Sequence, residues 1–197
     1  MVNADKTGLL GTLGTDHHQF GRLVSWLDNW AAEHAETPVF VQYGESPAPA
    51  VASGAAMLPK EELLDRVRVA FAVVTHGGTG SIMEARSCGK LPIVVPRLAR
   101  AREHVDDHQL VFARKLADTG WIRLAETEAE LHEHLRSAWE RPAEYRVQPT
   151  TQAIEHTKRN IDQLLTDVLY ERPGFVRPTR VRQLVRFLRA RKQNTSD

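Results

Sequence analysis

Residues 71–96 read FAVVTHGGTGSIMEARSCGKLPIVVP, and this pattern sets the architecture of the chain. The apolar run 71–75 has the length of a buried strand, residues 76–80 are rich in glycine, and residues 81–88 predict a helix. A second apolar run, 93–95, follows that helix. A strand, a glycine-rich turn, a helix and another strand in this order predict two parallel strands joined by a helical crossover.

The alternation of strands and helices extends on both sides of this segment. Helices are predicted where apolar residues recur every three or four positions, and strands where short apolar runs end near glycine. Thr127 and Glu130 have the spacing of a capping box, which predicts the start of a helix. The whole pattern predicts an α/β fold, a Rossmann-like parallel sheet with helices on both faces. The other predicted elements are strands 9–13 and 39–43, helices 19–35, 59–68, 107–117 and 128–140, and a loop at 46–54.

Length and composition limit the possible classes of protein. The chain has 197 residues, of which 42% are hydrophobic and 26% charged. This suits one medium α/β domain with an appendage and is too short for two such domains. The single cysteine, Cys88, excludes an intrachain disulfide and fits a reducing compartment. Residues 1–8 lack a signal-peptide pattern, and no apolar run reaches the ~20 residues that span a bilayer. We therefore expect a cytoplasmic protein.

The sequence changes character towards its end, which predicts a division into two parts. Residues 1–145 form the predicted Rossmann-like domain, and residues 146–197 form a predicted helical, basic tail. Residues 171–192 contain eight basic residues and one acid, whereas the overall formal net charge is only +1. Three roles are open for the tail: binding to anionic lipid, docking on a partner subunit, or a solvated terminus. The acidic body makes nucleic-acid binding an unfavourable interpretation.

The glycine-rich turn at 76–80 has the features of a phosphate-binding site. Without bulky side chains, its backbone N–H groups can approach a ligand closely, and the following helix aims about half a positive charge at the same point. A diphosphate would then lie at the carboxyl ends of the strands. A tight strand-to-helix connection is the simpler alternative. Ser81 and Glu84 are open to two interpretations as well: a capping box, or a carboxylate that accepts the hydroxyls of a ribose.

A set of motifs that extends beyond the turn resembles a known family. Together the motifs are similar to the C-terminal domain of glycosyltransferase family 28, the donor-binding half of MurG-type enzymes. The resemblance is closer to the small catalytic subunit of two-subunit UDP-GlcNAc transferases, and closest to its bacterial counterparts in capsule and exopolysaccharide assembly. The motifs that carry it are Gly11-Thr12-Leu13-Gly14-Thr15, Gln42-Tyr43-Gly44, His76-Gly77-Gly78-Thr79-Gly80-Ser81, Glu84-Ala85, residues 89–96 and Asp107-His108-Gln109.

The resemblance implies a role for each matching position. Glu84 would hold the ribose, and Gln109 would contact the hydroxyls of the donor sugar, with Asp107 and His108 beside it. The family is metal-independent and inverts the anomeric centre, so no cofactor and no metal site are expected. The loop Gly14-Thr15 would face the phosphates or the acceptor cleft. The residues that would surround the pyrophosphate and the donor sugar are His76, Gly77, Gly78, Thr79, Gly80 and Ser81.

An inverting transfer also needs a base that accepts the proton of the acceptor hydroxyl. Asp16-His17-His18 follows the first strand, on the same rim as the glycine-rich turn, and a histidine has a suitable pKa. We name His17 as the candidate base, with His18 and Asp16 as substitutes. The alternative is a helix start capped by Asp16, with two exposed histidines. His104 and His108 have the i, i+4 spacing of zinc ligands, but the sequence indicates no third ligand.

The resemblance also implies a missing half. A GT-B enzyme holds its acceptor between two Rossmann-like domains, and only the donor domain is recognised in this chain. We therefore expect a membrane-anchored partner subunit, a lipid-linked sugar acceptor, and a peripheral location at the inner face of the plasma membrane. The donor is expected to be a UDP-sugar, with GlcNAc, glucose, galactose and glucuronic acid all open. The alternatives are a non-catalytic nucleotide-sugar-binding or activating subunit and a UDP-GlcNAc 2-epimerase-like enzyme.

Overall fold

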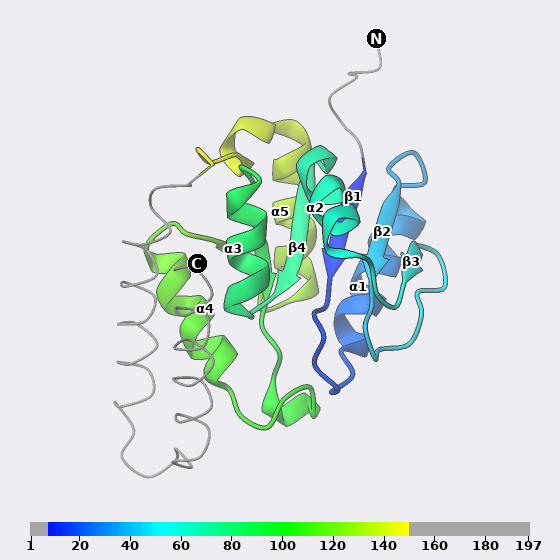
Figure 1. Cartoon of the computed structure of the whole chain (residues 1–197), viewed down its shortest axis with the longest axis vertical. Helices are drawn as coiled ribbons and strands as arrows, with labels where there is room; N and C mark the ends of the chain where they lie inside the picture. Colours follow the sequence, from blue (N-terminus) through cyan, green and yellow to red (C-terminus); the bar gives the residue numbers. More distant parts are fainter. Residues whose placement is uncertain (1–7, 150–197) are drawn as a thin grey trace, which may run out of the picture.

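The computed structural model describes residues 8–149, which fold around one six-stranded sheet (Figure 1). All neighbouring strands are parallel, in the order β3-β2-β1-β4-β5-β6. This confirms the predicted Rossmann-like sheet. The strands are β1 (Leu9–Thr12), β2 (Val39–Gln42), β3 (Ser53–Ala55), β4 (Ala72–His76), β5 (Ile93–Val95) and β6 (Arg123–Leu124).

Helices cover both faces of the sheet (Figure 1). One face packs against α1 and α5, and the other against α2, α3 and α4. The five helices predicted within residues 8–149 are all present, with ends shifted by a few residues. The helices are α1 (Gly21–Glu33), α2 (Lys60–Val69), α3 (Thr79–Ser87), α4 (His108–Asp118) and α5 (Glu128–Glu140), with short 3-10 turns η1 (Ala99–Ala101) and η2 (Pro142–Tyr145).

The central strands are buried on both faces, which explains their continuous apolar sequences. In β4, Ala72 and Val74 pack with α1 and α5, whereas Val73 between them packs on the opposite face with α2 and α3. Val73 and Val74 are 2% and 0% exposed. Full burial of such a side chain contributes roughly 1.5–3 kcal/mol, so the central strands hold the two helical layers together.

The strand order creates one special position in the sheet. β1 lies between β2 and β4, and Thr12 is in register with both Gln42 and Thr75. After β1 the chain leads to α1 on one face, and after β4 it leads to α3 on the other. The connections diverge at this point and leave a crevice outside the carboxyl ends of the two strands, where ligands bind in open α/β sheets.

Two strands were not predicted. β3 lies at the end of the predicted loop 46–54, and its sequence Ser53-Gly54-Ala55 has no apolar periodicity. It is stabilised by backbone pairing with β2 at the edge of the sheet. β6 has only two residues. The interpretation of Asp16 as a helix cap is wrong, because the N-cap of α1 is Phe20 and no side chain of the described residues caps that helix.

The last described residues pair with the segment that connects α3 to β5. Tyr145 accepts a hydrogen bond from the amide of Leu91 at 2.9 Å, and Val147 donates to Gly89 at 3.0 Å. Most of the predicted basic tail lies outside the described residues, so the division at 145/146 stays a prediction. Within residues 8–149, no helix combines the length and apolar character needed to cross a membrane.

Candidate functional site

A cleft of about 460 Å³ opens at the divergence between β1 and β4. It is bounded by the loop after β1, the end of β2, the first turns of α3 and one side of α2. Seven of the residues predicted to bind the donor meet there, although the sequence separates them into two segments. The lining residues are Thr12, Gly14, Thr15, Asp16, Gln42, Leu63, His76, Gly78, Gly80, Ser81 and Glu84.

The imidazole of His76 occupies the centre of this arrangement, between two glycines. A Cβ added at Gly14 would lie 2.4 Å from His76 Nε2, and one at Gly78 would lie 2.2 Å from Cε1. Gly14 also has a φ of +78°, which disfavours any other residue. Both glycines are therefore required by the position of the ring, in addition to any approach of a ligand.

Hydrogen bonds and burial keep His76 neutral. Its Nδ1 accepts the N–H of Gly78 at 3.1 Å, which places the proton of the neutral ring on Nε2, 3.2 Å from Ser81 Oγ. Burial, together with the charge of Arg97, lowers the pKa of His76 from 6.5 to about 4. At neutral pH the ring is thus an uncharged hydrogen-bonding group in the wall of the cleft.

The N-terminus of α3 is open towards the cleft. Its N-cap is Gly78, and no side chain of the described residues caps it. The first intrahelical bond is donated by Ile82 to Gly78 O at 3.2 Å, so the amides of Thr79, Gly80 and Ser81 precede it. A Cβ at Gly80 would meet nothing within 4 Å. Free amides, the helix dipole and open space together favour an anion here.

Glu84 lies further along α3 and also lines the cleft. The capping-box interpretation of Ser81 and Glu84 is wrong, because α3 begins at Thr79 and Ser81 is already inside the helix. The carboxylate of Glu84 is 37% exposed and lies 3.8 Å from Nζ of Lys60, on α2. It is therefore available to accept hydroxyl groups. Lys60 has no distinguishing signal in the sequence, where it resembles any exposed helix lysine.

The segment Asp107-His108-Gln109 lies beside the cleft, and within the described residues it is not part of the cleft wall. Gln109 is buried, and its Oε1 accepts the amide of Arg97 at 3.3 Å. A Cβ added at Gly77 would lie 3.0 Å from the Cβ of Gln109, so the two residues are in close contact. Asp107 accepts the amide of Ala99 at 2.8 Å and faces a separate recess. The predicted contact of these side chains with a donor sugar stays a prediction.

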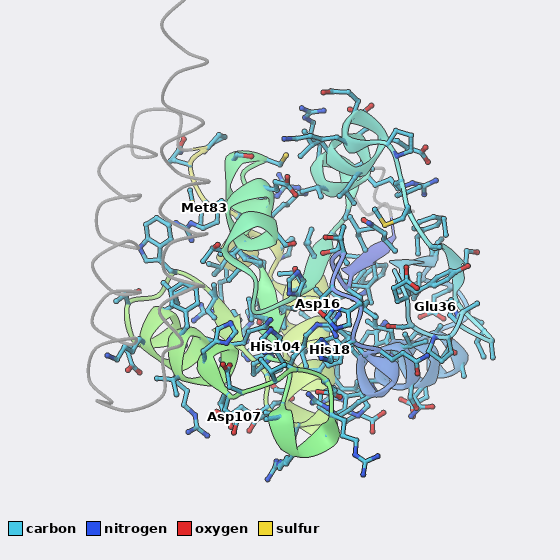
Figure 2. All side chains as sticks on the ribbon, turned by 60° about the horizontal axis from the view of Figure 1, so that its bottom comes forward. Asp16, His18, Glu36, Met83, His104 and Asp107 are labelled. Atoms are coloured by element: carbon cyan, nitrogen blue, oxygen red, sulfur yellow. The ribbon has the colours of Figure 1, made fainter. Side chains whose placement is uncertain are left out.

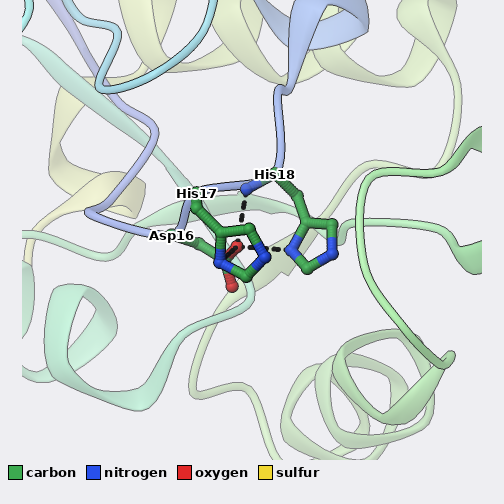
Figure 3. A group of neighbouring side chains, drawn as sticks. All are labelled: Asp16, His17 and His18. Carbon is green, nitrogen blue, oxygen red and sulfur yellow. Dashed lines mark hydrogen bonds and ion pairs between the residues drawn. The ribbon is translucent and has the colours of Figure 1, made fainter.

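The loop after β1 brings Asp16 and His18 together (Figure 3). One carboxylate oxygen of Asp16 accepts the amide of His18 at 2.8 Å and lies 2.6 Å from its Nδ1. His17 is 3.6 Å from the same oxygen, and its side chain is 85% exposed. The geometry therefore orients His18, rather than His17, in the way a carboxylate orients a catalytic histidine.

The same hydrogen bonds fix the charge of Asp16. Burial alone would raise the pKa of this carboxyl, but the bonds from His18 and the charge of Arg97 outweigh that effect and lower the pKa to about 2. Asp16 is consequently ionised at neutral pH and has little affinity for a proton. Its geometry suits it to position His18 rather than to act as a base itself.

Arg97, directly after β5 and Pro96, holds the surrounding loops in place. Its side chain is fully buried and donates to Leu13 O at 2.9 Å, His18 O at 2.6 Å and Glu103 O at 3.1 Å. This role was not predicted from the sequence, because arginine is usually exposed. Its position just past a strand end was the one available signal.

Comparisons with known proteins show the family and the fold of the chain. Residues 14–165 match the glycosyltransferase family 28 C-terminal domain. No curated protein shows significant sequence similarity to the chain. Three solved structures share the fold: ALG13 (18% identity, TM-score 0.56), the kitacinnamycin glycotransferase (17%, 0.51) and MurG of Acinetobacter baumannii (22%, 0.50).

The three structures differ in how much of them the chain spans. The alignment with ALG13 covers 81% of this chain and 98% of ALG13. The alignments with the kitacinnamycin enzyme and MurG cover 85% and 83% of this chain, but only 41% and 51% of those proteins. The chain thus spans about half, or less, of the two longer structures.

Proposed function

The chain belongs to the glycosyltransferase family 28 C-terminal domain family, and we propose that it is the donor-binding and catalytic subunit of an inverting UDP-sugar glycosyltransferase. One observation carries this proposal: the uncapped N-terminus of α3 and the carboxylate of Glu84 line the same cleft at the divergence of the sheet. A diphosphate and a ribose are the two parts of a nucleotide that such groups recognise.

Each part of the donor has a matching part of the cleft. The amides of Thr79, Gly80 and Ser81 bind the diphosphate, with the helix dipole behind them. Neutral His76 adds no charge, and its proton on Nε2 is held towards Ser81. Glu84, about one helical turn further on, accepts the ribose hydroxyls.

The proposed reaction is a single displacement at the anomeric carbon. The acceptor hydroxyl attacks that carbon, the bond from the carbon to the UDP oxygen breaks, and the bonding electrons leave with UDP. The amides at the start of α3 stabilise the charge that develops on the diphosphate. His18, held by Asp16, accepts the proton of the attacking hydroxyl, and His17 is the second candidate. The resemblance to the family implies that this step requires no metal.

We further propose that another polypeptide supplies the acceptor-binding domain. The resemblance to small catalytic subunits supports this. The partner is membrane-anchored, the acceptor is a lipid-linked sugar, and the complex lies at the inner face of the plasma membrane in polysaccharide or glycolipid assembly. The basic tail either docks on this partner or binds anionic lipid.

Calorimetry with UDP and four UDP-sugars (GlcNAc, glucose, galactose and glucuronic acid) tests donor binding. The E84Q variant should bind UDP about 10- to 100-fold more weakly, because it loses charge-assisted bonds to the ribose. E62Q is the matched control, since Glu62 pairs with Arg66 on the surface of α2 at 3.0 Å and, within residues 8–149, does not line the cleft. Absence of UDP binding to the wild-type chain, or equal affinities of both variants, would refute the proposal.

Turnover by the reconstituted pair separates catalysis from passive binding. The isolated chain should bind the donor but transfer poorly, and the pair should lose transfer when His18 is replaced by glutamine. If E84Q and H18Q both leave turnover of the pair unchanged, the chain is a non-catalytic or activating subunit.

A further inference from the structure

A second cluster of ionisable side chains lies next to the cleft, in the loop that leads into α4. His104, Asp106 and His108 each offer one donor atom, and these atoms lie within 4.8 Å of one another. His104 and His108 are the pair whose i, i+4 spacing in the sequence is that of zinc ligands. The loop between them supplies Asp106, the third donor that the helical spacing did not indicate.

His104 carries the strongest sign of a bound ion. Its side chain is only 11% exposed, and its buried Nδ1 has no hydrogen-bond partner within the described part of the chain. That nitrogen lies 3.6 Å from Asp106 Oδ1, and His108 Nδ1 bonds the same oxygen. A buried polar atom without a partner is costly, and a metal ion among the three donors would satisfy it.

The donor set fits zinc. Two imidazole nitrogens and one carboxylate oxygen are ligands of zinc-class ions, whereas magnesium and calcium prefer oxygen alone. Tetrahedral ligands about 2.1 Å from zinc lie about 3.4 Å apart. His104 Nδ1 and Asp106 Oδ1 are 3.6 Å apart, whereas His108 Nδ1 hydrogen-bonds the same oxygen and has to move away from it for both to bind one ion. Asp106 and His108 are 34% and 39% exposed, so the fourth position is accessible to water.

The surroundings of His104 resemble the outer shell of a metal site. Its other ring nitrogen, Nε2, lies 3.7 Å from Asp16 Oδ2, and Figure 2 shows Asp16, His18 and His104 close together. Metal-bound histidines usually donate their second N–H to a carboxylate. Asp16 is the carboxylate beside Nε2, and an approach of about 0.5 Å would bring the two into hydrogen-bond distance.

We propose that His104, Asp106 and His108 bind one divalent ion of the zinc class, with Asp16 as the carboxylate of the outer shell. The ion fixes the loop before α4 against the loop after β1. Because Asp16 also lines the donor cleft, the ion is linked to that cleft without taking part in the proposed transfer. The site goes beyond the proposed function and does not depend on the identity of the donor.

Zinc titration of the untagged full chain by calorimetry tests this site. The wild-type chain should bind one zinc ion and show no comparable binding of magnesium. D106N and H108A should each weaken zinc binding at least about 100-fold, and D16N should weaken it about 10- to 100-fold, as outer-shell changes do. Cobalt in place of zinc should give the visible absorption of a tetrahedral nitrogen–oxygen site, and H108A should remove that absorption.

His17→Ala is the matched control, because Asp16, His17 and His18 form the competing set of donors. H17A should bind zinc like the wild type. Loss of binding in H17A with retention in H108A would move the site to the competing set and overturn the proposal, as would the absence of specific zinc binding. Circular dichroism and metal-free melting verify that each variant folds, and the exposed position of His108 makes H108A a mild change.

Discussion

The N-termini of α3 and α5 differ in whether a side chain caps their backbone amides. At α5, Thr127 accepts the amide of Glu130 at 3.3 Å, and Glu130 accepts the amide of Thr127 at 3.3 Å. At α3, the N-cap is Gly78 and no side chain of residues 8–149 caps the helix. The side-chain cap of α5 satisfies backbone amides at its N-terminus. The amides at the uncapped N-terminus of α3 stay available to hydrogen-bond a ligand in the cleft.

The difference arises from where the polar side chains lie. α3 has Thr79 and Ser81 in its first turn, but both are inside the helix, where a hydroxyl cannot act as the N-cap. Ser81 Oγ instead lies 3.2 Å from the ring of His76. The hydroxyl therefore supports the wall of the cleft and leaves the amides free.

The largest effect is expected in the pH dependence of the free energy of unfolding, to which His76, just before α3, contributes. Because the pKa of His76 is about 4 in the folded chain and 6.5 ordinarily, the unfolded chain binds more protons between these values. Stability should therefore fall as pH drops from about 6.5 to about 4, by about 3 kcal/mol in total from this group, and level off below. Urea unfolding across this range measures the slope, and H76N should remove this component. An unchanged slope in H76N would show that His76 is not the cause.

Gly80→Asp should break the contrast between the two helices directly. A carboxylate in the open space before the α3 amides would compete with the diphosphate and cost about 2–3 kcal/mol of UDP binding. The stability of the fold should be unchanged or slightly higher, since an acid in a first turn is favourable. Calorimetry and thermal melting on the same sample separate the two effects, with G80A as the control. A G80D chain that binds UDP normally would contradict a diphosphate site at α3.

Thr127→Ala should produce the reverse pattern. Loss of the α5 cap should lower the free energy of unfolding by about 1 kcal/mol. UDP affinity should stay at the wild-type value, because α5 packs against the opposite face from α3. Chemical denaturation measures the first quantity and calorimetry the second. T127S, which keeps a hydroxyl, should retain most of the stability. A drop in the UDP affinity of T127A would mean that the N-termini of α5 and α3 are coupled.

Lys60→Ala should have the smallest effect. The pair with Glu84, at 3.8 Å, joins two side chains that are 66% and 37% exposed, so stability should change by less than about 1 kcal/mol. Removing the lysine leaves the Glu84 carboxylate free for the ribose. The free energy of UDP binding should therefore also change by less than about 1 kcal/mol. A loss of affinity as large as that of E84Q would instead assign Lys60 a direct contact with the nucleotide.

Much of the fold was predictable because its signals are local. β4, α3 and β5 follow from the continuous apolar runs and the glycine-rich turn between them, and the capping box of α5 follows from two residues three positions apart. β3 was missed because it depends on pairing with β2 rather than on its own side chains. A three-residue edge strand of small residues gives no periodic signal.

The candidate site shows the same difference between features set by neighbouring residues and features set by tertiary packing. The sequence by itself determined the strand–turn–helix unit and the glycines beside His76, because neighbouring residues decide backbone conformation. Only the tertiary structure placed Gly14 against His76, joined Arg97 to the loop after β1, and brought Asp16 to His104. Those contacts depend on β1 lying between β2 and β4, and strand order results from packing across the whole sheet, which no local pattern encodes.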